Sequence, residues 1–225
     1  MGFLTSNDNE TNDDALATFH FPTSKKALII FARNPELGKC KTRLAQTIGD
    51  EYALDIYKTL LEHTAQISSN VNADKFVFYS EHIHKNDTWD DNIFRKKLQQ
   101  GENLGERMSN AFKELFQNNY QKVVIIGSDI LDLSSQIINH AFNSLDENDT
   151  VIGPAKDGGY YLLGMKTLHQ EVFQNKDWGT ATVLENTLEN LSNKSVYLLE
   201  ELNDIDTFED IKDYPQLKKY SIHYD

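Results

Sequence analysis

Short apolar runs alternate with amphipathic segments along most of the chain. ALIIFA (27–32) is a continuous apolar run, and KVVIIGSD (122–129) begins as one. This pattern is typical of strands buried on both faces of a sheet. The further predicted strands are KFVFYS (75–80), TVIGPA (150–155), GYYLLGM (159–165) and SVYLL (195–199).

Apolar residues at helical spacing predict helices between these strands. The most regular spacing predicts a helix over 104–117, and others are expected from an N-cap at Asp50, from an N-cap at Ser134, and near 180–191. Alternating strands and helices predict a single-domain, Rossmann-like α/β fold with a mostly parallel central sheet and helices on both faces. Ligands of such folds bind at the carboxyl ends of the strands.

Composition limits the classes of partner. The chain has 225 residues, of which 39% are hydrophobic and 25% charged, as in ordinary globular proteins. Its formal net charge of -13 argues against binding to nucleic acid or an anionic membrane, which needs a broad basic face. Without an apolar run of 18 residues we expect no membrane span, and a single cysteine fits a cytoplasmic location.

The N-terminal stretch differs from the rest. Residues 1–24 carry four carboxylates and no lysine or arginine, and few apolar residues are spaced to form a face. We therefore predict an acidic, mobile or partly ordered arm over 1–24 and one folded domain over 25–225.

Three cations gather in NPELGKCKTRL (34–44) against this acidic background. Lys39, Lys41 and Arg43 follow the turn residues Pro35 and Gly38, directly after the first predicted strand. Lysine and arginine side chains in this position suit the phosphates of a nucleotide. The stretch matches neither the Walker nor the dinucleotide-binding pattern, and a solvated basic turn paired with neighbouring acids is the structural alternative.

Two aspartates follow strand-like runs and are candidate metal ligands. Asp129 ends the run KVVIIGSD, and Asp206 lies in NDIDTFED (203–210). Such carboxylates can hold Mg²⁺ or Mn²⁺ together with substrate phosphates. Alternatively, Asp129 hydrogen-bonds its own turn and Asp206 caps a helix that begins near Thr207. One metal site requires the fold to bring the two carboxylates together.

A glycine turn carries a third candidate site. GPAKDGGYYLLG (153–164) combines Asp157, Gly158 and Gly159 with Tyr160 and Tyr161. Adjacent glycines allow a ligand to approach the backbone closely, and tyrosine can stack on or hydrogen-bond a sugar or base. A purely structural hairpin has the same sequence signal.

Six segments in order carry a family resemblance: GKCKTRL, QQGENLGERMSNAF, VVIIGSDILDL, GPAKDGGYYLLG, DWGT and NDIDTFED. Over about residues 26–213 the chain resembles the glycosyltransferase-like family called radical-SAM/selenodomain-associated transferase 1. That family is related to the 2-phospholactate guanylyltransferases. The resemblance implies the nucleotide-diphospho-sugar transferase fold, of the glycosyltransferase A type.

The resemblance also implies roles for individual residues. It implies that Lys39, Lys41 and Arg43 bind nucleotide phosphates, and that Asp129 and Asp206 are the ligands of a divalent cation. Asp157, Gly158, Gly159 and Tyr160 match a loop that lines the sugar or acceptor pocket, and Trp178 and Thr180 match a segment that closes over it. Glu106 and Arg107 match a segment without a defined role, partly structural at a helix start.

The implied function is a metal-dependent transferase acting from a nucleotide-activated donor. We expect transfer of a sugar from a nucleotide sugar to a small-molecule acceptor, with Asp157 orienting or deprotonating a hydroxyl. Attack at the α-phosphorus of a nucleoside triphosphate, with release of pyrophosphate, is the alternative. A third possibility is a nucleotide-binding module that has lost turnover.

Overall fold

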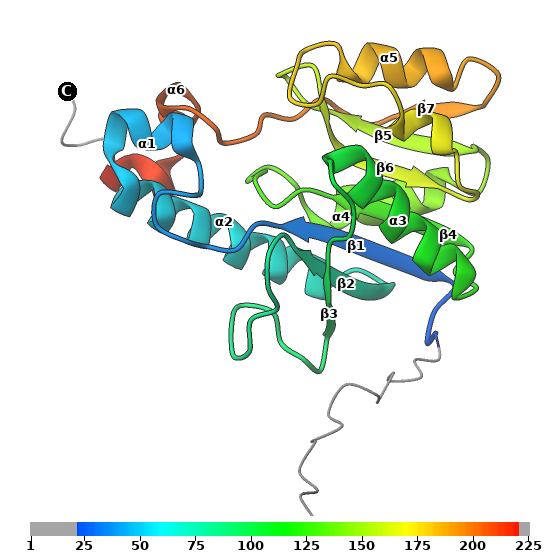
Figure 1. Ribbon diagram of the computed structural model, residues 1–225, viewed down its shortest axis with the longest axis horizontal. Helices are drawn as coiled ribbons and strands as arrows, with labels where there is room; N and C mark the ends of the chain where they lie inside the picture. The colour runs from blue at the N-terminus through cyan, green and yellow to red at the C-terminus, as the bar shows by residue number, and fades with distance from the viewer. Residues whose placement is uncertain (1–21, 221–225) are drawn as a thin grey trace, which may run out of the picture.

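The structure is a computed structural model that describes residues 22–220 (Figure 1). Residues 1–21 of the predicted arm lie outside the described residues. The strands are β1 (Lys26–Ala32), β2 (Asp74–Tyr79), β3 (Phe94–Leu98), β4 (Lys122–Ile126), β5 (Thr150–Pro154), β6 (Tyr160–Met165) and β7 (Val196–Leu198). The helices are α1 (Thr42–Ile48), α2 (Asp50–Ser69), α3 (Leu104–Gln117), α4 (Ser135–Ser144), α5 (Val183–Asn190) and α6 (Phe208–Ile211), with short 3₁₀ segments η1 (Gln170–Phe173) and η2 (Pro215–Tyr220).

The seven strands form one sheet in the order β3-β2-β1-β4-β6-β5-β7. All neighbouring pairs are parallel except the two that involve β6. Because β6 alone runs in the opposite direction, its first residues lie at the same edge as the carboxyl ends of the other strands. The predicted α/β class with a mostly parallel sheet is confirmed.

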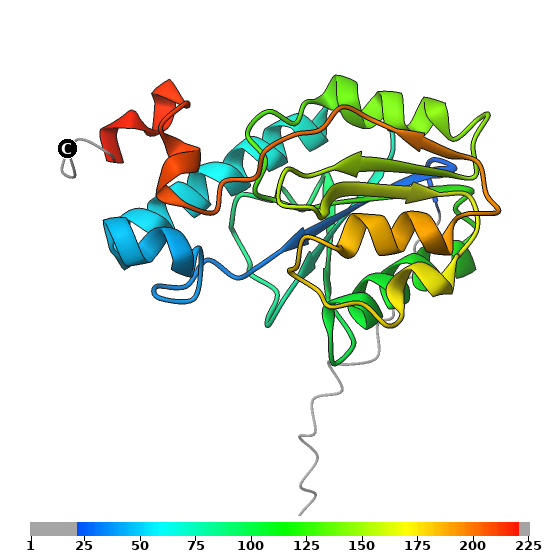
Figure 2. The ribbon, with the colours of Figure 1, turned by 90° about the horizontal axis from the view of Figure 1, so that it is seen from above.

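Helices cover both faces of the sheet, as Figure 2 shows, with α2 and α4 on one side and α3 and α5 on the other. Alternate residues of β1 supply the two cores. Leu28 and Ile30 pack on the side of α2 and α4, whereas Ala27 and Ile29 pack on the side of α3. Both sets are fully buried, which is why the sequence of this strand is continuously apolar rather than alternating.

One strand and one α-helix were not predicted from the sequence, nor were the two 3₁₀ segments. β3 lies at the edge of the sheet and has the sequence FRKKL, which lacks the apolar pattern of a strand because three of its five side chains are charged. α1 has only seven residues and follows the basic stretch directly, so Arg43 lies inside a helix rather than in a loop before one. Gly49, with φ 85, separates α1 from α2 and takes the N-cap position predicted for Asp50, which is the first residue of α2. The predicted cap at Ser134 is confirmed, because its hydroxyl accepts a hydrogen bond from Ile137 N.

Among the described helices, none is long and apolar enough to cross a membrane.

A buried carboxylate joins the start of β2 to its surroundings. Asp74 is 5% exposed and accepts hydrogen bonds from Tyr120 Oη at 2.6 Å and from the backbone and hydroxyl of Thr23. Burial alone would raise the pKa of Asp74, but the hydrogen bonds from Thr23 and Tyr120 and the charge of Arg95 together hold it below its usual value.

We predict that Asp74→Asn lowers the free energy of unfolding by about 2 kcal/mol at pH 7, because the amide replaces one of the two accepting oxygens with an NH2 group, which cannot accept hydrogen bonds. A carboxyl whose pKa is depressed in the folded state stabilises the fold above the unfolded pKa of about 4, and this contribution is lost as the pH falls through the folded pKa. The difference in the free energy of unfolding between wild type and Asp74→Asn, measured by urea unfolding, should therefore become smaller below about pH 4. Tyr120→Phe, which removes one hydrogen bond, should cost about 1 kcal/mol. If this difference in the free energy of unfolding did not change with pH, the stabilising role of the ionised Asp74 carboxylate would be contradicted.

Candidate functional site

The candidate site lies at the carboxyl ends of β1 and β4, where the turn between β5 and β6 also lies. Backbone hydrogen bonds bring the segment after β7 to this edge. Lys156 N donates to Leu202 O at 3.1 Å, and Ile205 N donates to Asp129 O at 2.9 Å. Figures 1 and 2 show the same segment leading to α6, which lies beside α1. Residues from four distant parts of the chain thus meet at one sheet edge.

Two of the predicted phosphate-binding cations contact the two predicted metal ligands. Lys41 Nζ lies 3.1 Å from Asp129 Oδ2 and 3.9 Å from Asp206 Oδ1. Arg43 donates to Asp206 Oδ2 at 3.0 Å. The Lys41 side chain is only 9% exposed, whereas that of Arg43 is 69% exposed. The fold therefore brings both carboxylates within reach of a single cation.

The start of α1 gives Lys41 this position. Lys41 is the N-cap residue of α1 and adopts the left-handed conformation, with φ 48 and ψ 47. A non-glycine residue in this region pays a conformational cost that the surrounding contacts must offset. Here the ion pair with Asp129 stabilises the side chain that the turn directs inward.

Lys39 lies apart from this network. Its ammonium group is 2.6 Å from Glu36 Oε2 and 3.5 Å from Glu81 Oε2, and its side chain is 59% exposed. Lys39 thus pairs with acids of the loops after β1 and β2 rather than with the two predicted metal ligands. The predicted trio of cations divides into a pair at the carboxylates and one cation elsewhere.

A cavity of about 280 Å³ adjoins Asp129. Its wall is largely apolar, with Phe31, Met108 and Val183 among its residues. The lining also includes the following predicted site residues: Asp129, Asp157, Gly159, Tyr160, Trp178 and Thr180. Five residues expected from the sequence to contact a sugar or acceptor, Asp157 and Gly159 among them, therefore line one cavity beside the predicted metal ligand.

Aromatic rings and a fixed carboxylate shape this cavity. The rings of Tyr160 and Trp178 meet edge to face, with centroids 6.5 Å apart. Burial raises the pKa of Tyr160, so its hydroxyl stays protonated. Asp157 Oδ1 accepts a hydrogen bond from Gly159 N at 2.8 Å, which fixes the carboxylate at the turn.

Gly158 does not line the cavity, although the sequence suggests that it should. It has φ 87, and a Cβ atom there would lie 2.3 Å from the carbonyl oxygen of Ala181. Its own carbonyl oxygen accepts from Leu184 N at 2.9 Å. Gly158 therefore holds the 178–182 segment against the turn and acts on the cavity through packing.

Asp204 is a cavity residue that the sequence reasoning missed. It lines the same space as Asp129 and Asp157. Burial raises the pKa of Asp204 to about 6, and the neighbouring charges of Asp129 and Asp157 add to the effect. The sequence holds one signal, because apolar Ile205 stands between Asp204 and Asp206 and side chains two apart in an extended segment share a face. That pattern places Asp204 on the same side as Asp206.

Glu106 and Arg107 form part of a helix start. Asn103 caps α3 by accepting from Glu106 N at 3.0 Å, and Glu106 accepts in return from Asn103 Nδ2 and from Glu102 N. Arg107 Nε donates to Gly101 O at 3.0 Å. These contacts satisfy polar groups at the helix N-terminus, as the sequence interpretation allowed.

Comparisons with known proteins identify the family and the fold. The DUF2064 family model, described as an uncharacterized protein conserved in bacteria, matches residues 63–180. No curated protein matches the sequence. A crystal structure from Desulfovibrio desulfuricans G20, provisionally named a nucleotide-diphospho-sugar transferase, is 30% identical, with a TM-score of 0.79 over 88% of this chain and 95% of that one.

More distant solved structures share the fold. The 4-diphosphocytidyl-2C-methyl-D-erythritol synthase of Anaerococcus prevotii DSM 20548 is 13% identical, with a TM-score of 0.53, and the match covers 88% of this chain and 95% of that one. A CMP:2-keto-3-deoxy-manno-octonic acid synthetase in complex with CTP is 9% identical, with a TM-score of 0.51 over 88% of this chain and 100% of that one. With the sheet order, the family match and the Desulfovibrio relative taken together, the chain belongs to the DUF2064 family, within the nucleotide-diphospho-sugar transferase superfamily.

Proposed function

We propose that this protein transfers a sugar from a nucleotide sugar to a small hydroxylated acceptor. The observation that carries the proposal is the pairing of Lys41 and Arg43 with Asp129 and Asp206 beside a cavity with aromatic walls. Cations and carboxylates at one point suit a diphosphate, whereas the adjoining cavity suits the part of the donor or acceptor that carries no phosphate.

The cationic pair is the proposed diphosphate site. Arginine offers a planar pair of donors to phosphate oxygens, and lysine a compact charge. Developing negative charge on a leaving nucleoside diphosphate is stabilised when such groups are already positioned. Lys41, which is nearly buried and held at Asp129, is placed for this role, and Arg43 at the rim is placed to meet the donor as it enters.

The two carboxylates fit a divalent cation. Asp129 and Asp206 both contact Lys41 Nζ, so a single positive centre already lies between their oxygens. Mg²⁺ and Mn²⁺ use one or two carboxylates and complete their shell with water and substrate phosphates. When bound, such an ion would supply positive charge to the diphosphate, and Asp129 and Asp206 would hold it.

The cavity favours an uncharged, hydroxylated group. None of the described residues that line it is a lysine or arginine, and its carboxylates Asp129, Asp157 and Asp204 disfavour an anionic ligand. Sugar rings present an apolar face to aromatic side chains such as Trp178 and hydroxyls to carboxylates. This chemistry supports a sugar more strongly than a phosphorylated acceptor.

Asp157 is the proposed base. The acceptor hydroxyl gives its proton to the carboxylate while its oxygen bonds to the anomeric carbon of the sugar. The bond from that carbon to the diphosphate oxygen breaks, and its electron pair leaves with the nucleoside diphosphate. The hydrogen bond from Gly159 N fixes the carboxylate at the cavity, which supports this positioning.

Nucleotidyl transfer is the second candidate, and one observation favours it. The fold is shared with cytidylyltransferases, among them a synthetase in complex with CTP. The same cations would then meet a triphosphate, and the product would be pyrophosphate rather than a nucleoside diphosphate. The resemblance to the radical-SAM/selenodomain-associated transferases leaves glycosyl transfer as the first proposal.

The donor class can be identified by the shift in melting temperature that ligands cause. Nucleotide sugars and nucleoside triphosphates, each with and without Mg²⁺ or Mn²⁺, should be compared, because a ligand that binds the native state raises the melting temperature. We expect a metal-dependent shift with a nucleotide sugar. A shift with triphosphates alone would favour nucleotidyl transfer, and no shift with any of them would contradict both candidates.

We predict that Lys41→Ala and Arg43→Ala weaken nucleotide binding by about tenfold or more, with the larger loss at buried Lys41. Asp129→Asn should instead abolish the effect of Mg²⁺ on binding. Isothermal titration with the donor found in the thermal comparison measures both effects. Lys58→Ala, an exposed change on α2, is the matched control. Unchanged affinity in Lys41→Ala would disprove the phosphate assignment.

We predict that Trp178→Ala raises KM for the sugar-containing substrate by up to about tenfold, since an aromatic contact is worth about 0.5–1.5 kcal/mol and about 1.4 kcal/mol corresponds to a factor of ten. Binding of the free nucleoside diphosphate should stay within about twofold of wild type, because it depends on the cationic pair. Steady-state kinetics and nucleotide titration test the two halves separately. Equal losses of both affinities would show that Trp178 acts on the whole fold.

A further inference from the structure

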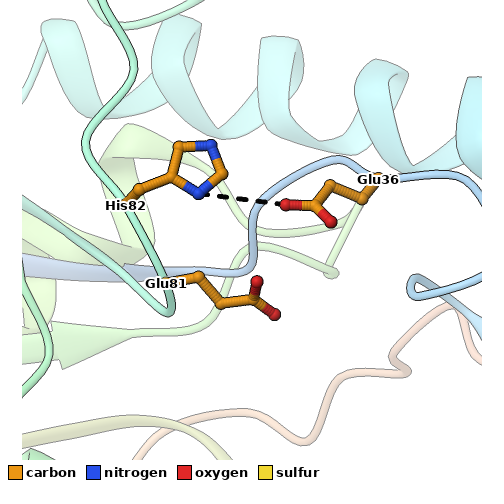
Figure 3. A group of neighbouring side chains, drawn as sticks. All are labelled: Glu36, Glu81 and His82. Carbon is orange, nitrogen blue, oxygen red and sulfur yellow. Dashed lines mark ion pairs between the residues drawn. The ribbon is translucent and has the colours of Figure 1, made fainter.

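We propose that Glu36, Glu81 and His82 form a binding site for a transition-metal ion of the Zn²⁺ class, separate from Asp129 and Asp206. Figure 3 shows the three side chains converging from two loops. Their ligand atoms all lie within 4.8 Å of one another, and His82 Nδ1 is 3.9 Å from Glu36 Oε1. Among residues 22–220 this is the one group of three or more such side chains at that spacing.

The spacing is close to that of an occupied site. Zinc lies about 2.0–2.2 Å from imidazole nitrogen and carboxylate oxygen, so its ligand atoms are roughly 3.3–3.6 Å apart in a tetrahedral arrangement. The separation of 3.9 Å between His82 Nδ1 and Glu36 Oε1 exceeds this by a few tenths of an ångström, which a small side-chain rotation closes. All three residues are at least partly exposed, which leaves them free to rotate.

A buried asparagine fixes the backbone that carries these ligands. Asn34, which is 3% exposed, accepts from Glu81 N at 2.9 Å and donates to His82 O at 2.7 Å. It belongs to the loop that also carries Glu36, so the loops after β1 and β2 are tied together directly behind the site. The backbone positions of Glu81 and His82 are therefore fixed by the buried Asn34 side chain.

A cation already lies between the two carboxylates. Lys39 Nζ is 2.6 Å from Glu36 Oε2 and 3.5 Å from Glu81 Oε2. The position of Lys39 shows that a positive charge fits between these two carboxylates. Exposed pairs of this kind contribute little stability, so a divalent ion can displace the flexible lysine.

A second histidine lies next to the cluster. The rings of His82 and His84 have centroids 4.5 Å apart. His84 is not one of the three residues whose ligand atoms lie within 4.8 Å of one another, so the proposed ligands are Glu36, Glu81 and His82 alone.

The ligand types favour one class of ion. Imidazole nitrogen suits Zn²⁺, Co²⁺ and Ni²⁺, whereas Mg²⁺ prefers carboxylates, phosphates and water. This cluster therefore differs chemically from Asp129 and Asp206, which offer carboxylate oxygen only. An ion at Glu36 would also release Lys39 and fix the loop that leads to Lys41.

Metal titration of the full chain, free of any affinity tag, tests the proposal. We expect one Zn²⁺ to bind, measured by competition with a chromophoric chelator, and Co²⁺ to give the visible absorption of a site with nitrogen and oxygen ligands. Glu36→Gln and His82→Ala should each weaken Zn²⁺ binding by about tenfold or more. Asp129→Asn combined with Asp206→Asn should leave it unchanged.

The variant Lys39→Ala tests whether Zn²⁺ displaces Lys39 from the two carboxylates or binds elsewhere on the surface. Removing the competing cation should tighten Zn²⁺ binding several-fold, an effect that general surface binding would not show. Glu62→Gln and His140→Ala, exposed changes elsewhere, are the matched controls and should have no effect. The proposal is overturned if the wild type binds no Zn²⁺. It is also overturned if Glu36→Gln and His82→Ala, shown to be folded by their circular dichroism spectra, bind Zn²⁺ with the affinity of the wild type.

Discussion

The contact between Lys41 and Asp129 is the interaction on which the candidate site depends. It joins the turn after β1 to the end of β4 across 88 residues of sequence. Because Lys41 is nearly buried, its charge needs a partner, and Asp129 and Asp206 supply it. The same arrangement keeps the two carboxylates close together, and Arg43 pairs with Asp206 as well. The ion pairs that neutralise these charges therefore also fix the geometry of the candidate site.

The parallel sheet explains why this contact can form. β1 and β4 are neighbours and point the same way, so their following loops begin side by side. The reversed strand β6 brings the Asp157 turn to that edge, and the hydrogen bond from Ile205 N to Asp129 O draws in the segment after β7. The loops after β1 and β2 meet at this edge too, where Asn34 connects them. Both proposed sites form because the loops that follow neighbouring parallel strands begin at the same edge of the sheet.

Overall negative charge and local positive charge are compatible here. A chain with a formal net charge of -13 repels anions at long range, so a nucleotide must be met by cations at short range. Lys41 and Arg43 are the cations proposed for this contact, next to the carboxylates proposed to hold a divalent ion. The cavity itself carries only carboxylates and apolar or neutral side chains among its described residues, so the proposed phosphate site and the proposed sugar site differ in charge although they adjoin.

Much of the site followed from local signals. The run ALIIFA predicted a strand buried on both faces, and the turns at Gly38 and Gly159 marked the loops that carry Lys41, Asp157 and Tyr160. Asp129 could be singled out because a carboxylate at the end of an apolar strand has no role in packing. These predictions rest on periodicity and turn chemistry, which are properties of short segments.

Local sequence was enough to predict the class of fold and to single out the residue types of the candidate site, because both depend on neighbours along the chain. Which charges meet depends on the folded chain. Lys39 and Lys41 are two residues apart, yet one pairs with Glu36 and Glu81 and the other with Asp129. The burial of Asp204 and the convergence of His82 with Glu36 likewise depend on contacts between distant segments, which no local pattern encodes.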